Sequence, residues 1–255
     1  MKFSDIINYP LSLLGLKLAR ISSIRKLENL PAQNLEDIKA DIAFMNIYKQ
    51  VKAFTLVEME RCYALYKSVQ YVVEKNIPGD FVECGVWRGG SAMLIALTLE
   101  KENTTDRKIY LYDTYTGMPK PETEDGTKAL EIWDTKEKNE EGSDWCFATY
   151  DDVYANMMGS GYPSENIVFV KGKVEATIPS LIPEKIALLR LDTDWYSSTR
   201  HELVHLYPLL APSGILIVDD YGAWPGARKA VDEYFADKNP VYFHRIDETG
   251  RLLVK

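Results

Sequence analysis

Carboxylates gather at two places late in the sequence, and their spacing indicates a metal site. Asp192 and Asp194 follow one apolar run, and Asp219 and Asp220 follow the next. Each run predicts a buried strand, and the ends of adjacent parallel strands lie close together, so these acids should crowd one edge of a sheet. Any one of them alone could be a solvated loop acid. Four unpaired carboxylates would repel one another, and a cation such as Mg²⁺, held by two or three carboxylates and several waters, would remove that cost.

A glycine-rich turn earlier in the chain indicates a site for a charged small molecule. Glu83 lies near the end of an apolar run, Gly85 permits a tight turn, and Gly89 and Gly90 let the backbone approach a ligand closely. Phosphate groups at such a turn prefer donors without a neighbouring anion, whereas a sulfonium compound with a charged amino group is attracted by a carboxylate. Glu83 therefore favours a sulfonium ligand, with an ordinary strand-to-helix turn as the alternative.

Asp113 ends the second apolar run of the domain. In dinucleotide-binding folds an acidic residue at this position accepts hydrogen bonds from ribose hydroxyls. Its separation from Glu83 is longer than the roughly 20 residues typical of that pattern, so a longer crossover is required. A strand-end aspartate can also form a turn or cap a helix, and both interpretations remain open here.

The segments around these residues alternate between short apolar runs and helical patterns. Strands separated by helices form right-handed crossovers and a parallel sheet, to which a C-terminal antiparallel hairpin can be added. The sequence therefore predicts an α/β fold with a mostly parallel sheet. The predicted strands are 80–84, 108–113, 167–171, 186–192 and 214–219, the helices are 91–101, 152–158 and 199–210, and the hairpin strands are 242–245 and 252–254.

The segment before the first strand has its own pattern. We expect an N-terminal helical appendage over residues 1–77, with a helical pattern over 55–74, and a main domain over 78–255. Residues 1–30 contain an apolar stretch that a proline interrupts and basic residues follow, which is too short and too charged to span a bilayer. We expect a helix that packs on the domain or joins subunits of a homo-oligomer, with a membrane-surface helix as the alternative.

A polar, acidic stretch over residues 119–146 breaks the alternation of strands and helices. Long loops in compact domains are usually lids or disordered segments. Trp133, Trp145 and Phe147 give this stretch apolar groups with which it can dock. We therefore expect either a lid over about 119–150 or a disordered loop.

Composition limits the partners and the compartment. The net charge of -8 argues against nucleic-acid binding, which needs a basic face, and mildly favours a cationic cofactor or a divalent metal. Three cysteines without a CxxC pair are a poor disulfide framework, so a cytoplasmic location is expected. The chain contains neither a Gly-x-Ser-x-Gly elbow nor a GxxxxGK[ST] loop, so serine hydrolases and P-loop enzymes fit poorly.

Four motifs follow one another along the chain: 83–91, 113–119, 191–199 and 218–222. Together they resemble the motifs of the macrocin O-methyltransferase (TylF-type) family, whose members are class I methyltransferases acting on sugar hydroxyls of natural products. The similarity runs from about residue 55 to about residue 235. It implies a Rossmann-like class I methyltransferase sheet, S-adenosylmethionine as the methyl donor, and a requirement for Mg²⁺.

The resemblance also implies residue roles by position. Asp192, Asp219 and Asp220 match the family's metal ligands, and Asp194 matches a carboxylate available as a general base. Trp195 stands where the family usually has a smaller aliphatic residue, so the acceptor pocket is not assigned. The residues expected at the cofactor are Thr55, Glu83, Gly85, Gly89, Ser91, Asp113 and, at the adenine edge, Gly172 and Lys173.

These residues predict methyl transfer to an activated hydroxyl. An alcohol is a poor nucleophile until it is deprotonated; a divalent metal lowers the pKa of a bound oxygen, and Asp194 or Asp192 could accept the proton. We expect a sugar with a vicinal diol as the acceptor, with a catechol or phenol as the alternative. Because Asp192-x-Asp194 is a DxD, a metal-dependent glycosyltransferase is a rival, which Glu83 beside the glycine turn disfavours. A cofactor-binding protein without catalysis is the last alternative.

Overall fold

The computed structural model describes residues 35–139 and 141–255. Residues 38–255 form one compact unit. The apolar helix expected within residues 1–30, and with it the expected subunit contact or membrane-surface role, lies outside the described residues. Within the described part of the chain, no helix is long and apolar enough to cross a membrane.

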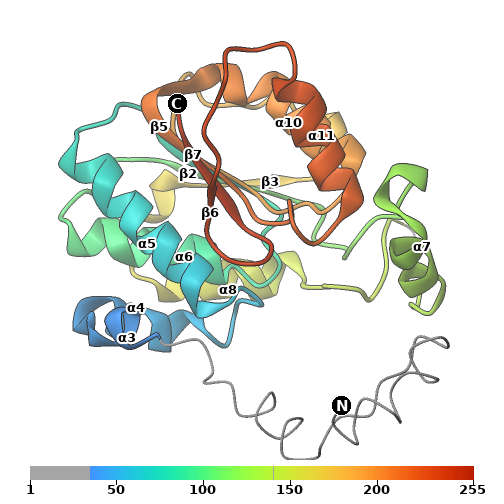
Figure 1. The fold of residues 1–255 in the computed structure, drawn as a ribbon. Helices are drawn as coiled ribbons and strands as arrows, with labels where there is room; N and C mark the ends of the chain where they lie inside the picture. Colours follow the sequence, from blue (N-terminus) through green and yellow to red (C-terminus); the bar gives the residue numbers. More distant parts are fainter. Residues whose placement is uncertain (1–34, 140) are drawn as a thin grey trace, which may run out of the picture. The chain divides into compact units, whose positions relative to one another are not determined.

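A seven-stranded sheet in the order β3-β2-β1-β4-β5-β7-β6 forms the centre of this unit (Figure 1). The first five strands run parallel, and β7 pairs antiparallel with both β5 and β6, which confirms the predicted α/β sheet with its C-terminal hairpin. The strands are β1 Asp80–Cys84, β2 Ile109–Asp113, β3 Ile167–Lys171, β4 Ile186–Leu191, β5 Leu210–Val218, β6 His244–Arg245 and β7 Arg251–Val254.

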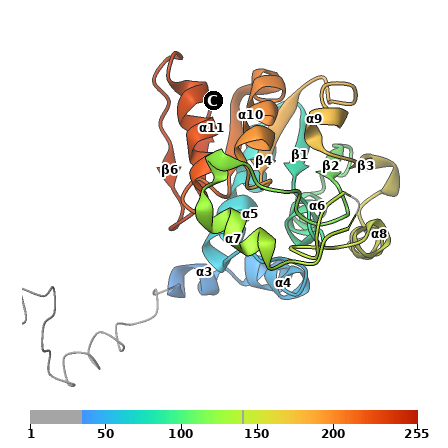
Figure 2. The ribbon, with the colours of Figure 1, turned by 90° about the vertical axis from the view of Figure 1, so that its right-hand side faces the viewer.

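Helices cover both faces of the sheet (Figures 1 and 2). One layer contains α4 Ile42–Val51, α5 Met59–Glu74, α6 Gly90–Lys101 and α8 Tyr150–Gly159; the other contains α9 Val174–Thr177, α10 Tyr196–His205 and α11 Pro225–Phe235. The remaining described helices are α3 Glu36–Ala40, α7 Thr127–Asp134 and the short 3-10 helices η1 Thr123–Asp125, η2 Ser164–Asn166 and η3 Tyr207–Leu209.

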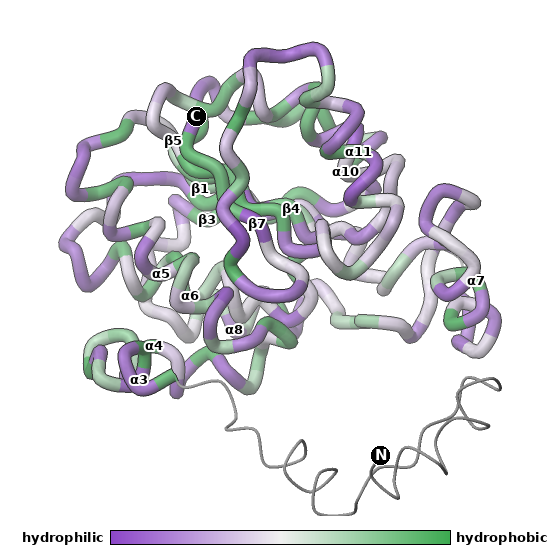
Figure 3. The backbone as a smooth tube through the Cα atoms, in the orientation of Figure 1, coloured by the Kyte–Doolittle hydropathy of each residue, from purple (hydrophilic) through white to green (hydrophobic). Residues whose placement is uncertain are grey.

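The central strands are apolar because both of their faces are covered. All six residues of β4 are buried, and the central strands are drawn mainly in the hydrophobic colour (Figure 3). The chain leaves β1 toward β2 on one side and returns to β4 on the other, so the direction of winding changes between β1 and β4. In such sheets ligands bind outside the carboxyl ends of the strands at this point.

A predicted helix and a predicted strand have other bounds in the structure. The helix predicted over 199–210 runs from Tyr196 to His205, and a 3-10 turn containing Pro208 follows it. The strand predicted from residue 214 begins at Leu210. Pro212, Ser213 and Gly214 read as a turn, but β5 passes through them with a register irregularity relative to β4, and Ser213 has a φ of 64°.

Three of the described α-helices were missed in the sequence: α7, α11 and the four-residue α9. In α11, Ala227, Ala230, Val231 and Tyr234 are buried at helical spacing behind Pro225 in the first turn, a signal that was available. In the acidic stretch, α7 buries Ala129 and Trp133 although the segment is mostly polar. The helix predicted over 55–74 begins only at Met59, and α5 packs against α6 within the unit formed by residues 38–255.

Candidate active site

A cavity of about 730 Å³ opens at the carboxyl ends of β1, β2, β4 and β5. Most of the residues expected at the site line this single cavity, although long stretches of sequence separate them. Glu83 and Gly89 do not line it: Glu83 is buried behind the wall, and Gly89 lies at the start of α6. The expected residues that line it are Thr55, Gly85, Ser91, Asp113, Gly172, Lys173, Asp192, Asp194, Asp219 and Asp220.

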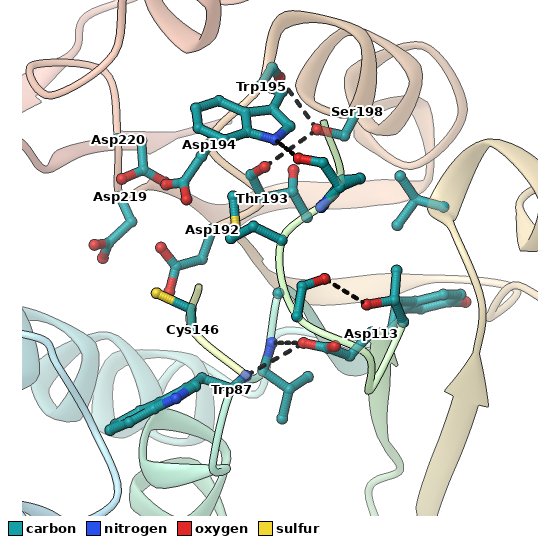
Figure 4. A pocket seen from close by; sticks show the side chains of 18 of the residues that line it. Trp87, Asp113, Cys146, Asp192, Thr193, Asp194, Trp195, Ser198, Asp219 and Asp220 are labelled. Atoms are coloured by element: carbon teal, nitrogen blue, oxygen red, sulfur yellow. Dashed lines mark hydrogen bonds between the residues drawn. The ribbon is translucent and has the colours of Figure 1, made fainter. Parts of the chain in front are cut away.

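The glycine turn after β1 is held by the carboxylate that ends β2. Asp113 accepts hydrogen bonds from the backbone N–H groups of Val86 at 2.7 Å, Trp87 at 3.2 Å and Tyr115 at 2.7 Å (Figure 4). Burial raises the pKa of Asp113, and these three backbone donors act in the opposite direction. Asp113 therefore fixes the shape of the turn as well as facing the cavity.

Two glycines allow other segments to approach this turn. Gly85 has a φ of 83°, and a Cβ there would lie 2.0 Å from the carbonyl oxygen of Asp192 at the end of β4. A Cβ at Gly90 would lie 2.5 Å from the carbonyl oxygen of Phe54, which accepts the Gly90 N–H at 2.9 Å. The glycines therefore bring both the acidic end of β4 and the segment containing Thr55 against the turn.

A buried arginine connects the two halves of the site. Arg190 on β4 is 2% exposed and donates from Nη1 to Glu83 at 2.6 Å and to Asp192 at 2.7 Å, and from Nη2 to Asp219 at 2.6 Å. Arg61 on α5 pairs with the other oxygen of Asp219. Sequence reasoning missed both arginines. The signal for Arg190 was a charged residue inside an apolar run, which needs buried counter-charges.

Three carboxylates at the ends of β4 and β5 lie close enough to share one ion. Oxygen atoms of Asp192, Asp194 and Asp220 lie within 4.8 Å of one another (Figure 4). Asp219, expected as a ligand, is not in this group, because its two oxygens accept from the two arginines. Asp194 occupies the left-handed region with a φ of 67°, a strained conformation for a residue with a side chain.

Among the residues that the structure describes, the three carboxyl groups of this cluster have too few positive charges nearby to balance their negative charges. Burial raises the pKa of Asp194 to about 7, and the pKa values of Asp192 and Asp220 lie well above the usual range, because burial and neighbouring carboxylates both disfavour the charged forms. Asp194 hydrogen-bonds to Asp220, and the buried Oδ2 of Asp220 has no hydrogen-bond partner. Two carboxyl groups in contact need a shared proton or a bound cation.

The acidic stretch, residues 119–146, lies beside the carboxylate cluster and is hydrogen-bonded to the start of α10. The buried Asp125 accepts from the backbone N–H of Tyr196, at the start of α10, at 2.7 Å and from that of Glu122 at 2.7 Å. Residues 117–120, the last two of them in the lid, line the cavity together with Trp145 and Cys146 of the lid. The expected lid thus contributes part of the cavity wall, and whether it opens stays a prediction.

Comparison with known proteins decides the family. A family model described as macrocin O-methyltransferase (TylF) matches residues 26–254. The chain belongs to this family. The resemblance inferred from the four motifs is thereby confirmed, and with it the prediction of an S-adenosylmethionine-dependent O-methyltransferase.

Named relatives of this TylF-family enzyme methylate oxygen atoms of natural products. It is 32% identical over 204 residues to demethyldecarbamoylnovobiocin O-methyltransferase of Streptomyces niveus, covering 76% of each chain. It is 32% identical over 182 residues to mycinamicin III 3''-O-methyltransferase of Micromonospora griseorubida, covering 71% of this chain and 70% of the relative.

Solved structures agree with the fold of the TylF-family enzyme. The structure of the O-methyltransferase NovP superposes with a TM-score of 0.71 at 29% identity, covering 79% of this chain and 82% of NovP. An O-methyltransferase from Bacillus cereus in complex with SAH superposes with a TM-score of 0.52 at 12% identity, covering 89% of this chain and 94% of that one, and shows the shared fold.

Proposed function

We propose that this methyltransferase transfers the methyl group of S-adenosylmethionine to a hydroxyl of a sugar in a glycosylated natural product, with Mg²⁺ at the acidic cluster. The observation that carries the proposal is the cluster of Asp192, Asp194 and Asp220 within the cavity that the glycine turn also lines. One relative is named as a 4'-O-methyltransferase of a compound that carries a dimethoxy-α-L-rhamnosyl unit, and another as a 3''-O-methyltransferase of mycinamicin III.

The cluster fits a hard divalent cation. Its donors are carboxylate oxygens, the type that Mg²⁺ prefers, and one buried oxygen of Asp220 lacks a partner. We propose Asp192 and Asp220 as ligands. Asp219 was expected as a third, and its bonds to Arg190 and Arg61 support a role in holding the strand ends in place. When bound, a divalent cation supplies a lowered pKa for a coordinated hydroxyl group and orients it.

Asp194 is the proposed proton acceptor. It lines the cavity, and its carboxyl oxygen lies within 4.8 Å of oxygens of the two proposed ligands. Its strained backbone supports a role at the reacting group, because such strain persists where the surrounding structure holds it. A carboxylate in hydrogen-bond reach of a hydroxyl can accept its proton as the new carbon–oxygen bond forms.

The other half of the cavity is the proposed cofactor site. Asp113, at the end of β2, faces the cavity where ribose hydroxyls bind in related folds, and Gly172 and Lys173 follow β3 beside it. Glu83 keeps one buried oxygen without a hydrogen-bond partner, which supports the proposed interaction with a cationic group. S-adenosylmethionine supplies the electrophilic methyl group, and the two halves of the cavity would aim the acceptor oxygen at it.

A direct assay tests the proposal. The purified protein is incubated with S-adenosylmethionine and Mg²⁺, and with either methyl α-L-rhamnopyranoside or catechol, and products are identified by mass spectrometry. We expect a methylated rhamnoside, loss of the product in EDTA and its return with Mg²⁺. Methylation of catechol without the rhamnoside would contradict the sugar acceptor, and full activity in EDTA would contradict the metal.

A further inference from the structure

Three tryptophans from distant parts of the sequence meet at one wall of the cavity. Trp145 belongs to the lid, Trp195 precedes α10, and Trp224 precedes α11. Their ring centroids lie 5.5 Å apart for Trp145 and Trp195, 5.8 Å for Trp145 and Trp224, and 5.3 Å for Trp195 and Trp224, with steeply inclined ring planes. All three line the cavity. We call this group the tryptophan wall.

The tryptophan wall adjoins the acidic cluster. Trp195 follows Asp194 directly in the chain, and Figure 4 shows its indole beside Asp194 and Asp220. The side chain of Trp224 acts to lower the pKa of Asp194, so these two side chains lie near each other. A molecule whose hydroxyl reaches Asp194 therefore has the ring that carries this hydroxyl within contact distance of the indoles.

The three indoles differ in how much surface they leave open. Trp195 is 3% exposed, and its Nε1 donates to the carbonyl oxygen of Pro119 at 3.0 Å. Its ring is therefore held in place and supports the other two indoles. Trp145 and Trp224 are only partly buried and rest edge-to-face against it. Large aromatic side chains held rigidly at a cavity offer contact area at little cost in conformational entropy.

We propose that Trp145 and Trp224 bind the apolar C–H face of the acceptor's sugar ring and thereby select a glycoside. The faces of indole rings carry partial negative charge, and the carbon-bound hydrogens of a pyranose carry partial positive charge, so the two surfaces attract. A ring lying flat on the tryptophan wall directs the hydroxyls on its rim toward the carboxylates. This inference rests on the proposed function, because it assigns the surface that recognises the acceptor.

Kinetics of matched variants test the role of the tryptophan wall. Trp145→Leu removes the aromatic face, and we expect it to raise KM for methyl α-L-rhamnopyranoside about tenfold with little change in kcat or in KM for S-adenosylmethionine. Trp145→Phe keeps an aromatic face and should retain most of the affinity. Trp133→Leu is the control, because Trp133 lies on α7 and does not line the cavity. Equal KM values for Trp145→Leu and Trp133→Leu would overturn the proposal.

Saturation-transfer NMR measures the contact without catalysis. The protein, loaded with S-adenosylhomocysteine and Mg²⁺, is mixed with the rhamnoside, and transfer to its ring protons is compared among the wild type, Trp145→Leu and Trp224→Phe. We expect transfer in the wild type and in Trp224→Phe, which keeps an aromatic ring but loses the indole N–H, and a several-fold loss in Trp145→Leu. Undiminished transfer in Trp145→Leu, or none in the wild type, would overturn the proposal.

The two proposals fail in different ways. If the wild type methylates the rhamnoside while Trp145→Leu leaves KM unchanged, the tryptophan wall is only structural and the sugar acceptor stands. If the wild type methylates catechol alone, the proposed sugar acceptor itself fails.

Discussion

The carboxylates on the two sides of the cavity differ in their partners. On the β1–β2 side, Glu83 pairs with Arg190, and Asp113 accepts three backbone N–H groups. On the β4–β5 side, the carboxyl group of Asp194 lies against that of Asp220, and one oxygen of Asp220 has no hydrogen-bond partner among the described residues. On the first side each carboxylate accepts from donors of the chain, although one oxygen of Glu83 has no partner in the described part of it, whereas the second side has an excess of negative charge that a bound cation would balance.

This difference indicates how the two sides bind their ligands. A carboxylate that is already hydrogen-bonded presents its remaining lone pairs in fixed directions, which suits a cofactor of constant shape. Within residues 35–139 and 141–255, Asp194 and Asp220 have no cationic partner and have raised pKa values, so a bound cation would stabilise their charged forms. Removing charge from either side should therefore have separate consequences.

The largest expected effect is on the β4–β5 side. Asp192→Asn and Asp220→Asn keep the shape but remove a charge, and each should lower kcat about 1,000-fold or more, in the way that EDTA should. Binding of S-adenosylhomocysteine, measured by its thermal shift, should persist because the glycine turn is untouched. Asp237→Asn, an exposed change after α11, is the control. Normal turnover by either cluster variant would remove the proposed distinction between the two sides.

A second change at the same cluster separates the proton acceptor from the metal ligands. Asp194→Asn should lower kcat by between about 100-fold and 10,000-fold, with a smaller effect on the Mg²⁺ concentration that gives half-maximal activity. That concentration is read from a Mg²⁺ titration of both proteins. A large increase for Asp194→Asn would instead make Asp194 a metal ligand, which the short distances in the cluster also permit.

The β1–β2 side should respond through stability and cofactor affinity. Glu83→Gln removes a charged partner of buried Arg190 and should destabilise the protein by about 1.5–3 kcal/mol. The stabilisation by S-adenosylhomocysteine in a thermal-shift assay should fall. Glu184→Gln changes the same residue type at an exposed position before β4 and should have neither effect. A Glu83→Gln protein with unchanged stability and an unchanged shift would show that this side does not depend on the charge.

The attachment of the lid is the next effect in size. Asp125→Ala removes the acceptor for two backbone N–H groups, one of them at the start of α10, and should cost about 1–2 kcal/mol. Hydrogen exchange over residues 119–146 should become faster, and the cofactor should still bind. Asp134→Ala, at an exposed position on α7, is the matched control. Equal exchange in the two variants would mean that Asp125 does not fasten the lid.

The smallest effect concerns a thiol at the same wall. Burial, followed by the charges of Asp194 and Asp192, raises the pKa of Cys146 to about 12. The thiolate is the reactive form, so at neutral pH Cys146 should react with iodoacetamide more slowly than an ordinary thiol, and faster as the pH rises. Mass spectrometry of the peptide that contains Cys146 follows the reaction. Rapid labelling at neutral pH would show that the lid is open in the free protein.

The sequence alone was sufficient to predict the sheet and the gathering of acidic residues at the carboxyl ends of its strands. Apolar runs of five to seven residues, each ending at or directly before an acid or a glycine, predict buried parallel strands, and β1 and β3 have the predicted bounds. The rule that parallel strands end at one edge then brought Asp113, Asp192 and Asp220 to one cavity, as the structure shows. These features depend on local periodicity and on a topological rule, and both can be read along the chain.

Three-dimensional packing decided which aspartates are paired with arginines and which have no cationic partner in the part of the chain that the structure describes. Asp219 and Asp220 are neighbours in the sequence, but successive side chains at a strand end point in different directions, so Asp219 meets two arginines and Asp220 meets Asp194. Arg61 and Arg190 lie far apart in the chain. Sequence spacing carries no information about such long-range pairing, and the tryptophan wall, assembled from the lid and two helix starts, was invisible for the same reason.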